Sequence, residues 1–222
     1  MFFTSQAIKP ADSTEPEIKK KALRALLWLG IVSIVMLFAG LTSAYIVRQG
    51  EGKWVDFALP QLFKLSSLII ILSSLTMQWG LMSIKKNSVK NLKTAMLLTL
   101  VLGLGFVLSQ YYAWSDLYHD GIVFTGTIKD IKTDFNYVPS GKESVADVPD
   151  AGNVAGSFLY VITGLHVAHV LVGMIALIVV FSRALLGKYT VTNYNGVKMC
   201  ATYWHFLGGL WLYLFLFLLY IR

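Results

Sequence analysis

Long apolar runs alternate with short polar segments along the chain, and five of the runs are long enough to cross a lipid bilayer. A spanning helix needs roughly 20 apolar residues. The runs cover about residues 22–47, 62–84, 92–114, 154–183 and 197–221. Because backbone amides cannot remain unpaired in hydrocarbon, we expect each run to be helical in spite of its β-branched residues. The pattern predicts an all-α membrane protein, a bundle of five transmembrane helices.

The polar segments divide the chain further. Residues 1–21 contain Pro10 and Pro16 and lack an apolar run, so we expect a solvated tail and no cleavable signal. Residues 22–222 then form one transmembrane domain, whose long loop at about 115–153 is rich in Asp and Glu. That loop is either a solvated connector or a docking surface for a partner with a basic face.

The charge distribution predicts how the helices are oriented. Only 14% of the residues are charged, against about 25% in a soluble globular chain. Placing the N-terminus inside puts most of the 19 Lys and Arg residues in inner segments and most of the 12 acids in outer segments. The positive-inside rule therefore predicts a cytoplasmic tail, a periplasmic acidic loop and an outer C-terminus. The net charge of +7 reflects basic inner loops, and we expect no nucleic-acid partner.

Acidic residues are absent from the five predicted spans. Proton pumps and ion-coupled transporters place carboxylates at membrane depth, so this absence argues against ion transport by the chain alone. The single cysteine, Cys200, excludes a disulfide framework and a cysteine-cluster metal site.

Three histidines lie within predicted spans: His166 and His169 in the fourth, and His205 in the fifth. Residues three apart share a helix face, so His166 and His169 could meet a metal or a haem. A free-standing membrane cytochrome is therefore one alternative. The other is that each histidine hydrogen-bonds a neighbouring helix or a lipid headgroup. Structural metal sites usually have four ligands, and the sequence offers no further ligand at a suitable spacing.

Four segments resemble a known family. Residues 163–173 (TGLHVAHVLVG) are similar to the TGxHGxHVxxG segment of subunit III of haem-copper respiratory oxidases, and residues 203–220 (YWHFLGGLWLYLFLFLLY) to its closing helix. Residues 33–40 (SIVMLFAG) and 103–114 (GLGFVLSQYYAW) resemble two further segments of that family. With five predicted spans, the chain looks like the five-helix form of subunit III.

The resemblance implies an accessory, non-catalytic subunit of a proton-pumping terminal oxidase in a bacterial inner membrane. The expected enzyme is cytochrome c oxidase; a quinol oxidase or a nitric oxide reductase partner are alternatives. The family holds no haem, copper or other metal in this subunit. It packs on the catalytic subunit I, which carries the redox centres, assembles with subunit II, and binds phospholipid. Other respiratory complexes are further possible partners.

The resemblance also implies roles for particular residues, none of them catalytic. Arg24 stands where the family has its lipid-phosphate arginine, and Arg183 and Lys188 suit the same role at other helix ends. Six residues are expected to act in structure and packing: Gln110, His166, His169, Trp204, His205 and Trp211.

Three positions depart from the family pattern. Ile34, Lys198 and Gly208 stand where the family often carries carboxylates. Any role that rests on those carboxylates, such as assistance in proton delivery, is therefore in doubt for this chain.

Overall fold

Five long helices make up the described part of the chain. The computed structural model describes residues 14–50, 54, 59–119, 122, 124 and 154–221. The helices are α1 (Thr14–Gln49), α2 (Leu62–Lys85), α3 (Val89–His119), α4 (Val154–Leu185) and α5 (Asn195–Tyr220). Each is long and apolar enough to cross a membrane, and no strand occurs among the described residues. The predicted all-α fold with five membrane-spanning helices is confirmed.

Two helices extend further than the apolar runs that predicted them. Helix α1 begins at Thr14, eight residues before the predicted span, so residues 14–21 of the expected tail are helical. Lysine favours helix, and Lys20 pairs with Glu17 one turn away, at 3.5 Å between Nζ and Oε1. Helix α3 continues to His119, into the predicted loop. Residues 1–13 and nearly all of the acidic loop beyond His119 lie outside the described residues.

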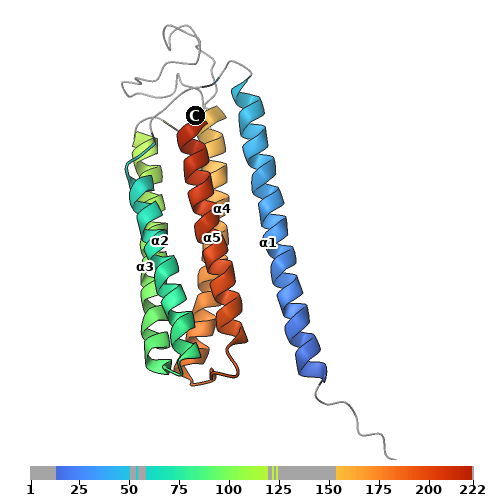
Figure 1. Ribbon diagram of the computed structural model, residues 1–222. Coiled ribbons are helices and arrows are strands. Elements are labelled where there is room, and N and C mark those ends of the chain that lie inside the picture. Colours follow the sequence, from blue (N-terminus) through green and yellow to red (C-terminus); the bar gives the residue numbers. More distant parts are fainter. Residues whose placement is uncertain are drawn as a thin grey trace, which may run out of the picture.

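Helices α2 to α5 form a closed four-helix arrangement. Helix α2 contacts α3, α3 contacts α4, α4 contacts α5, and α5 returns to α2. Helix α1 stands at the side of this bundle, and its described helix contacts are with α4 and α5 (Figure 1). The molecule is therefore a four-helix bundle with one peripheral helix.

The α2–α3 and α4–α5 connections use the same kind of helix stop. Asn87 after α2 and Gly187 after α4 have positive φ angles of 58° and 68°. The following amides bond back to the helix, from Ser88 to the Ser83 carbonyl at 2.9 Å and from Lys188 to the Arg183 carbonyl at 3.1 Å. This six-to-one hydrogen bond, closed around a residue with a left-handed backbone conformation, is the Schellman motif.

Both of these connections lie at the end of the bundle where α1 begins (Figure 1). We call it the basic end, because its described residues carry most of the positive charge. Its basic side chains are Lys19, Lys20, Lys21, Arg24, Lys85, Lys86, Lys90, Lys93, Arg183, Lys188 and Lys198. One of them fixes two helices together, since the Lys93 ammonium on α3 donates to the Leu185 carbonyl at the end of α4, at 3.3 Å.

A glycine in α3 allows close packing in the bundle centre. A Cβ atom on Gly103 would lie 2.9 Å from Cη2 of the Trp204 indole. Trp204 is almost completely buried, so the ring cannot move aside into solvent. Small residues allow helices to approach closely in lipid, and here the glycine makes room for a tryptophan of α5.

Candidate functional site

Helix α2 presents a row of serines that accept hydrogen bonds from tryptophans of α5. The Trp204 indole donates to Ser73 Oγ and the Trp211 indole donates to Ser67 Oγ, each at 3.0 Å. All four side chains are buried. Buried indole N–H groups need an acceptor, and these serines supply it.

Two more of the predicted packing residues contact the same row. Gln110 of α3 donates from Nε2 to Ser66 Oγ at 2.9 Å, and His205 of α5 is hydrogen-bonded through Nδ1 to the Ser74 hydroxyl. Four of the six predicted packing residues therefore converge on α2 serines that the sequence reasoning missed. The available signal was the repeat of Ser-Ser pairs at 66–67 and 73–74, seven residues or nearly two helical turns apart.

The two histidines of α4 are placed by aromatic rings. His166 is completely buried, with ring centroids 5.3 Å from Trp211, 5.9 Å from Phe106 and 6.4 Å from Phe38. His169 lies 5.9 Å from the same Phe38 ring, and its Nδ1 is 2.7 Å from the Leu165 carbonyl. Within the described ranges, no three or more His, Cys, Asp or Glu residues are grouped so that they could hold a metal ion.

Helix α1 is attached to the bundle through its C-terminal half. Its buried face consists of Ile31, Ile34, Phe38, Thr42 and Tyr45, at the three- and four-residue spacing of one helix face. No residue of α1 before Ile31 whose side chain is described is buried. The N-terminal half therefore stands away from α4 and α5, as Figure 1 shows.

The aromatic contacts of Tyr45 hold this attached half. Its ring centroid lies 4.5 Å from that of Trp54, 5.2 Å from that of Phe217 and 6.0 Å from that of Phe158, all edge-on. One helical turn earlier, the Thr42 hydroxyl lies 3.3 Å from the Tyr213 hydroxyl of α5.

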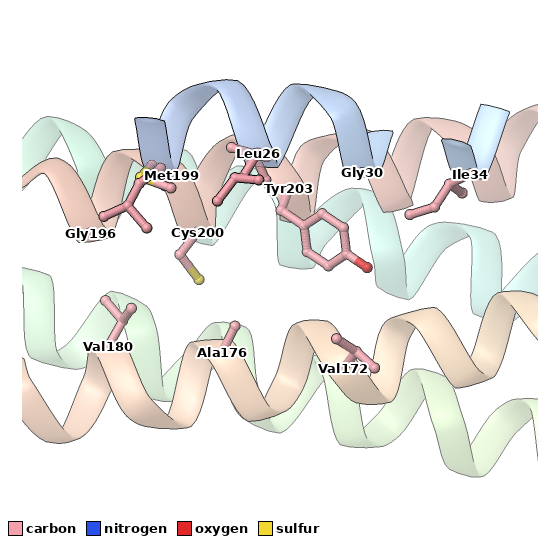
Figure 2. Close-up of a pocket in the computed structure, with 12 residues that line it drawn as sticks. Leu26, Gly30, Ile34, Val172, Ala176, Val180, Gly196, Met199, Cys200 and Tyr203 are labelled. Carbon is pink, nitrogen blue, oxygen red and sulfur yellow. The ribbon is translucent and has the colours of Figure 1, made fainter. Parts of the chain in front are cut away.

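An apolar groove of about 510 Å³ separates the N-terminal half of α1 from the bundle. We call it the α1 groove. It is lined by Leu23, Leu26, Leu27, Gly30 and Ile34 of α1, Val172, Ala176 and Val180 of α4, and Gly196, Met199, Cys200 and Tyr203 of α5. Figure 2 shows Cys200 and Tyr203 pointing from α5 into the space that α1 and α4 border. Ile34, where the resemblance led us to expect a carboxylate, is part of its apolar wall.

A smaller, polar pocket of about 200 Å³ adjoins the groove at the basic end. We call it the basic pocket. Its lining consists of Lys20, Arg24, Thr192, Asn193, Tyr194, Asn195 and Lys198. The two cavities are adjacent along both helices. On α1, Leu23 lines the groove and the next residue, Arg24, lines the basic pocket. On α5, Asn195 lines the basic pocket and the next residue, Gly196, lines the groove. An apolar slot with a basic mouth suits an amphiphile.

The other two predicted lipid-binding residues lie elsewhere. Neither Arg183 nor Lys188 is among the described residues that line the basic pocket. Arg183 lies beside Tyr189: burial raises the pKa of this phenol above its ordinary value, and the Arg183 guanidinium opposes that rise. Tyr189 in turn packs over Gly196, where a Cβ atom would lie 2.7 Å from the phenol oxygen. Lys188 is exposed.

Comparison with known proteins agrees with this architecture. The family model for cytochrome c oxidase subunit III matches residues 121–222. The chain is 31% identical over 201 residues to the probable cytochrome c oxidase subunit 3 of Mycobacterium leprae, covering 89% of this chain and 86% of that protein. It is 28% identical over 199 residues to cytochrome c oxidase subunit 3 of Thermostichus vulcanus, covering 86% of this chain and 83% of the relative.

A longer relative matches over a shorter stretch. The chain is 32% identical over 155 residues to the probable cytochrome c oxidase subunit 3 of Rickettsia felis, covering 69% of this chain and 45% of that protein. Similarity of this extent, together with five membrane-spanning helices, settles the family. The chain belongs to the cytochrome c oxidase subunit III family, and is thus a membrane subunit of a multi-subunit haem-copper oxidase.

Proposed function

We propose that the chain is the accessory, non-catalytic subunit of a proton-pumping terminal oxidase that takes electrons from cytochrome c. The similarity over 89% of the chain to a probable cytochrome c oxidase subunit 3 carries this proposal. Two of the three histidine environments support it, because His169 and His205 are hydrogen-bonded to a carbonyl and a serine. The third, His166, lies among three aromatic rings, and neither of its ring nitrogens has a hydrogen-bond partner among the described residues, contrary to the expectation that each histidine is hydrogen-bonded. On this proposal the haem and copper centres belong to partner subunits.

The expected partners are the catalytic subunit I, as the main contact, and subunit II. We place the protein in the bacterial inner membrane, with the basic end on the cytoplasmic side. The charge asymmetry of the described residues supports this orientation, since positively charged helix ends are retained inside.

We further propose that the α1 groove and the basic pocket together bind one phospholipid. The apolar groove suits an acyl chain, and Arg24 at its mouth suits a bidentate contact with the phosphate. Arg183 and Lys188 remain candidates for headgroup contacts at the neighbouring surface, while the specific contact is assigned to Arg24.

Purification of the tagged chain in mild detergent tests the subunit assignment. We expect a haem-bearing subunit to copurify, and the chain stripped of its partners to show no Soret absorption. A chain that is coloured when stripped would make the histidines ligands, and one that purifies alone and colourless would exclude the oxidase assignment.

Arg24→Ala tests the lipid site within the purified complex. We expect the variant to retain about one phospholipid fewer than the wild type by native mass spectrometry, because the phosphate loses a charge-assisted contact. Lys90→Ala is the matched control, since Lys90 is exposed at the same end of the bundle and does not line the basic pocket. Equal lipid content in all three proteins would contradict an Arg24–phosphate contact.

A further inference from the structure

A pair of polar side chains lies on the outer side of the bundle between α2 and α5. Ser74 of α2 and His205 of α5 are hydrogen-bonded through the hydroxyl oxygen and Nδ1, and both side chains are only partly buried. Among the described residues neither side chain has another hydrogen-bond partner, and His205 Nε2 is covered but unpaired.

The pair has an unpaired donor whichever nitrogen of the neutral imidazole carries the proton. If Ser74 donates to Nδ1, the ring proton is on Nε2, which has no acceptor. If Nδ1 donates to Ser74 instead, the hydroxyl hydrogen has no acceptor. In both cases one N–H or O–H group lacks an acceptor among the described helices.

This unpaired donor lies near the middle of the membrane. His205 comes ten residues after Asn195, where α5 begins, and this separation is about 15 Å along the helix. The hydrocarbon core of a bilayer is about 30 Å thick, so lipid headgroups do not reach the pair. An unpaired donor at this depth is costly, because hydrocarbon offers no acceptor.

A pocket of about 270 Å³ opens beside the pair. We call it the α2–α5 pocket. It is lined by Ile70, Ile71, Ser74 and Leu75 of α2 and by His205, Gly208, Gly209 and Leu212 of α5. A Cβ atom on Gly209 would meet no atom within 4 Å, so this glycine leaves open space and serves no tight contact within the chain. Ile71 and Leu75 are exposed, so no described part of the chain covers the pocket.

A further polar side chain lies on the same face of α2. Gln78 is one turn after Ser74, is exposed, and has no hydrogen-bond partner among the described residues. By contrast, the exposed hydroxyls of Ser33 and Ser182 donate to carbonyls of their own helices. Polar side chains within membrane spans usually hydrogen-bond another helix, so two unsatisfied polar sites one turn apart indicate a helix that is not part of this chain.

Lipid and water do not satisfy this face. An acyl chain can fill the α2–α5 pocket but brings no acceptor to the Ser74–His205 pair. The pocket has room for several water molecules at about 30 Å³ each, and each needs two to four polar partners. The lining offers only two polar side chains, on a wall of isoleucine, leucine and glycine. A transmembrane helix can bring both an apolar side chain and a hydrogen-bonding one.

We propose that Ser74, Gln78 and His205 contact a transmembrane helix of a partner subunit, which presents a hydrogen-bond acceptor to the Ser74–His205 pair and an apolar side chain to the α2–α5 pocket. A carboxylate, a carboxamide or a hydroxyl group can supply the acceptor. Side chains at the rim change rotamer as the helix reaches the covered nitrogen, as is common on association. This inference rests on the proposed assembly with other oxidase subunits and adds the face and the chemistry of the contact.

Site-specific photo-crosslinking in the purified complex tests the face. A benzophenone amino acid replaces Leu75 at the pocket or, as the matched control, Ile175 of α4; these side chains are 61% and 62% exposed. The two positions lie at similar depth, since Trp204 contacts both Ser73 of α2 and Gly173 of α4. We expect Leu75 alone to crosslink to a partner peptide that contains an acceptor side chain. Adducts of Leu75 with lipid only, or with a second copy of this chain, would overturn the proposal.

Two substitutions test the chemistry and the shape of the contact. His205→Phe keeps a ring but removes the hydrogen-bonding nitrogens, and should release the partner about fivefold more readily under a detergent wash. Gly209→Leu should fill the pocket and exclude the partner helix, while the circular dichroism of the chain stays unchanged, because a Cβ atom there meets no neighbour. Gly105→Leu is the control, since its Cβ atom also meets nothing and it does not line the pocket.

The outcomes separate this inference from the proposal on which it rests. A wild-type chain that purifies without a partner subunit would contradict the oxidase assembly itself. A wild-type chain that keeps its partners, while Gly209→Leu and Gly105→Leu keep them equally well, would contradict only the contact at the α2–α5 pocket.

Discussion

Helices α2 to α5 and helix α1 are held in place by different means. The four-helix bundle is closed on itself and is joined by side-chain hydrogen bonds between buried groups, such as those from Trp204 and Trp211 to serines of α2. Helix α1 is joined mainly by aromatic contacts along one half, with one hydroxyl pair between Thr42 and Tyr213, and its other half borders a groove. In lipid, apolar burial does not drive helices together. Polar contacts therefore specify how helices α2 to α5 pack together, whereas α1 borders a space that a lipid can fill.

The largest expected effect is on the bundle. Gly103→Leu should lower the free energy of unfolding by about 3 kcal/mol, because a Cβ atom at this position already lies 2.9 Å from Trp204. Thermal unfolding of the detergent-solubilised chain, followed by tryptophan fluorescence, measures the loss. The control is Gly105→Leu, two residues away, where a Cβ atom meets nothing within 4 Å. Equal stability of the two variants would show that the α3–α5 contact is not tight.

A change in the attachment of α1 should act locally. Tyr45→Ala removes three aromatic contacts and should weaken the docking of α1 by about 2 kcal/mol, with little effect on the unfolding of α2 to α5. Spin labels at Leu37 of α1 and Val179 of α4, in a Cys200→Ala background, should then give a broader distance distribution.

Tyr220→Ala serves as the control for that variant, because Tyr220 is among the most exposed large side chains, at 78%. A distance distribution unchanged by Tyr45→Ala would mean that the remaining contacts of Phe38 and Thr42 hold α1 by themselves. A drop in bundle stability equal to that of Gly103→Leu would mean that α1 and the bundle unfold as one unit.

The smallest expected effect concerns a single hydrogen bond. Ser67→Ala removes the acceptor of the Trp211 indole and should cost about 1 kcal/mol in free energy of unfolding. Ser182→Ala, at an exposed position where the hydroxyl donates to the Ile178 carbonyl of its own helix, should cost nothing measurable. Unfolding by a denaturing detergent, followed by circular dichroism, resolves the difference, and equal values would argue that the serine row contributes no stability.

The five spans could be predicted from the sequence because an apolar run of roughly 20 residues that crosses hydrocarbon must satisfy its backbone hydrogen bonds internally, as a helix does. The apolar run that begins at about residue 22 does not report the start of helix α1, because hydropathy marks where a span begins, whereas the helix already begins at Thr14 and includes Lys19 to Lys21. Gln110, Trp204, His205 and Trp211 were expected to act in packing, but their partners were not identified. Serine is common in transmembrane helices, so Ser66 and Ser73 do not stand out by residue type.

The groove could not be predicted from the chain alone. It depends on the angle between the bundle and the part of α1 that precedes Ile31, and this angle is set by contacts with residues far away in sequence. Arg24 was expected at the headgroup level from its place in the sequence. Its neighbours in the basic pocket, Lys198 and the start of α5, are brought to it only by the fold.

The serines of α2 also bear on the state of this helix before the bundle forms. Ser66 and Ser67 both donate to the Phe63 carbonyl of their own helix, at 3.0 Å and 2.8 Å. Their hydroxyl hydrogens are thus already bonded before any other helix arrives, and only lone pairs remain to receive Gln110 and Trp211. At these two positions α2 therefore carries no unpaired donor before α3 and α5 pack against it, whereas the Ser73 hydroxyl donates to the Thr99 carbonyl of α3 and gains that acceptor only when the two helices meet.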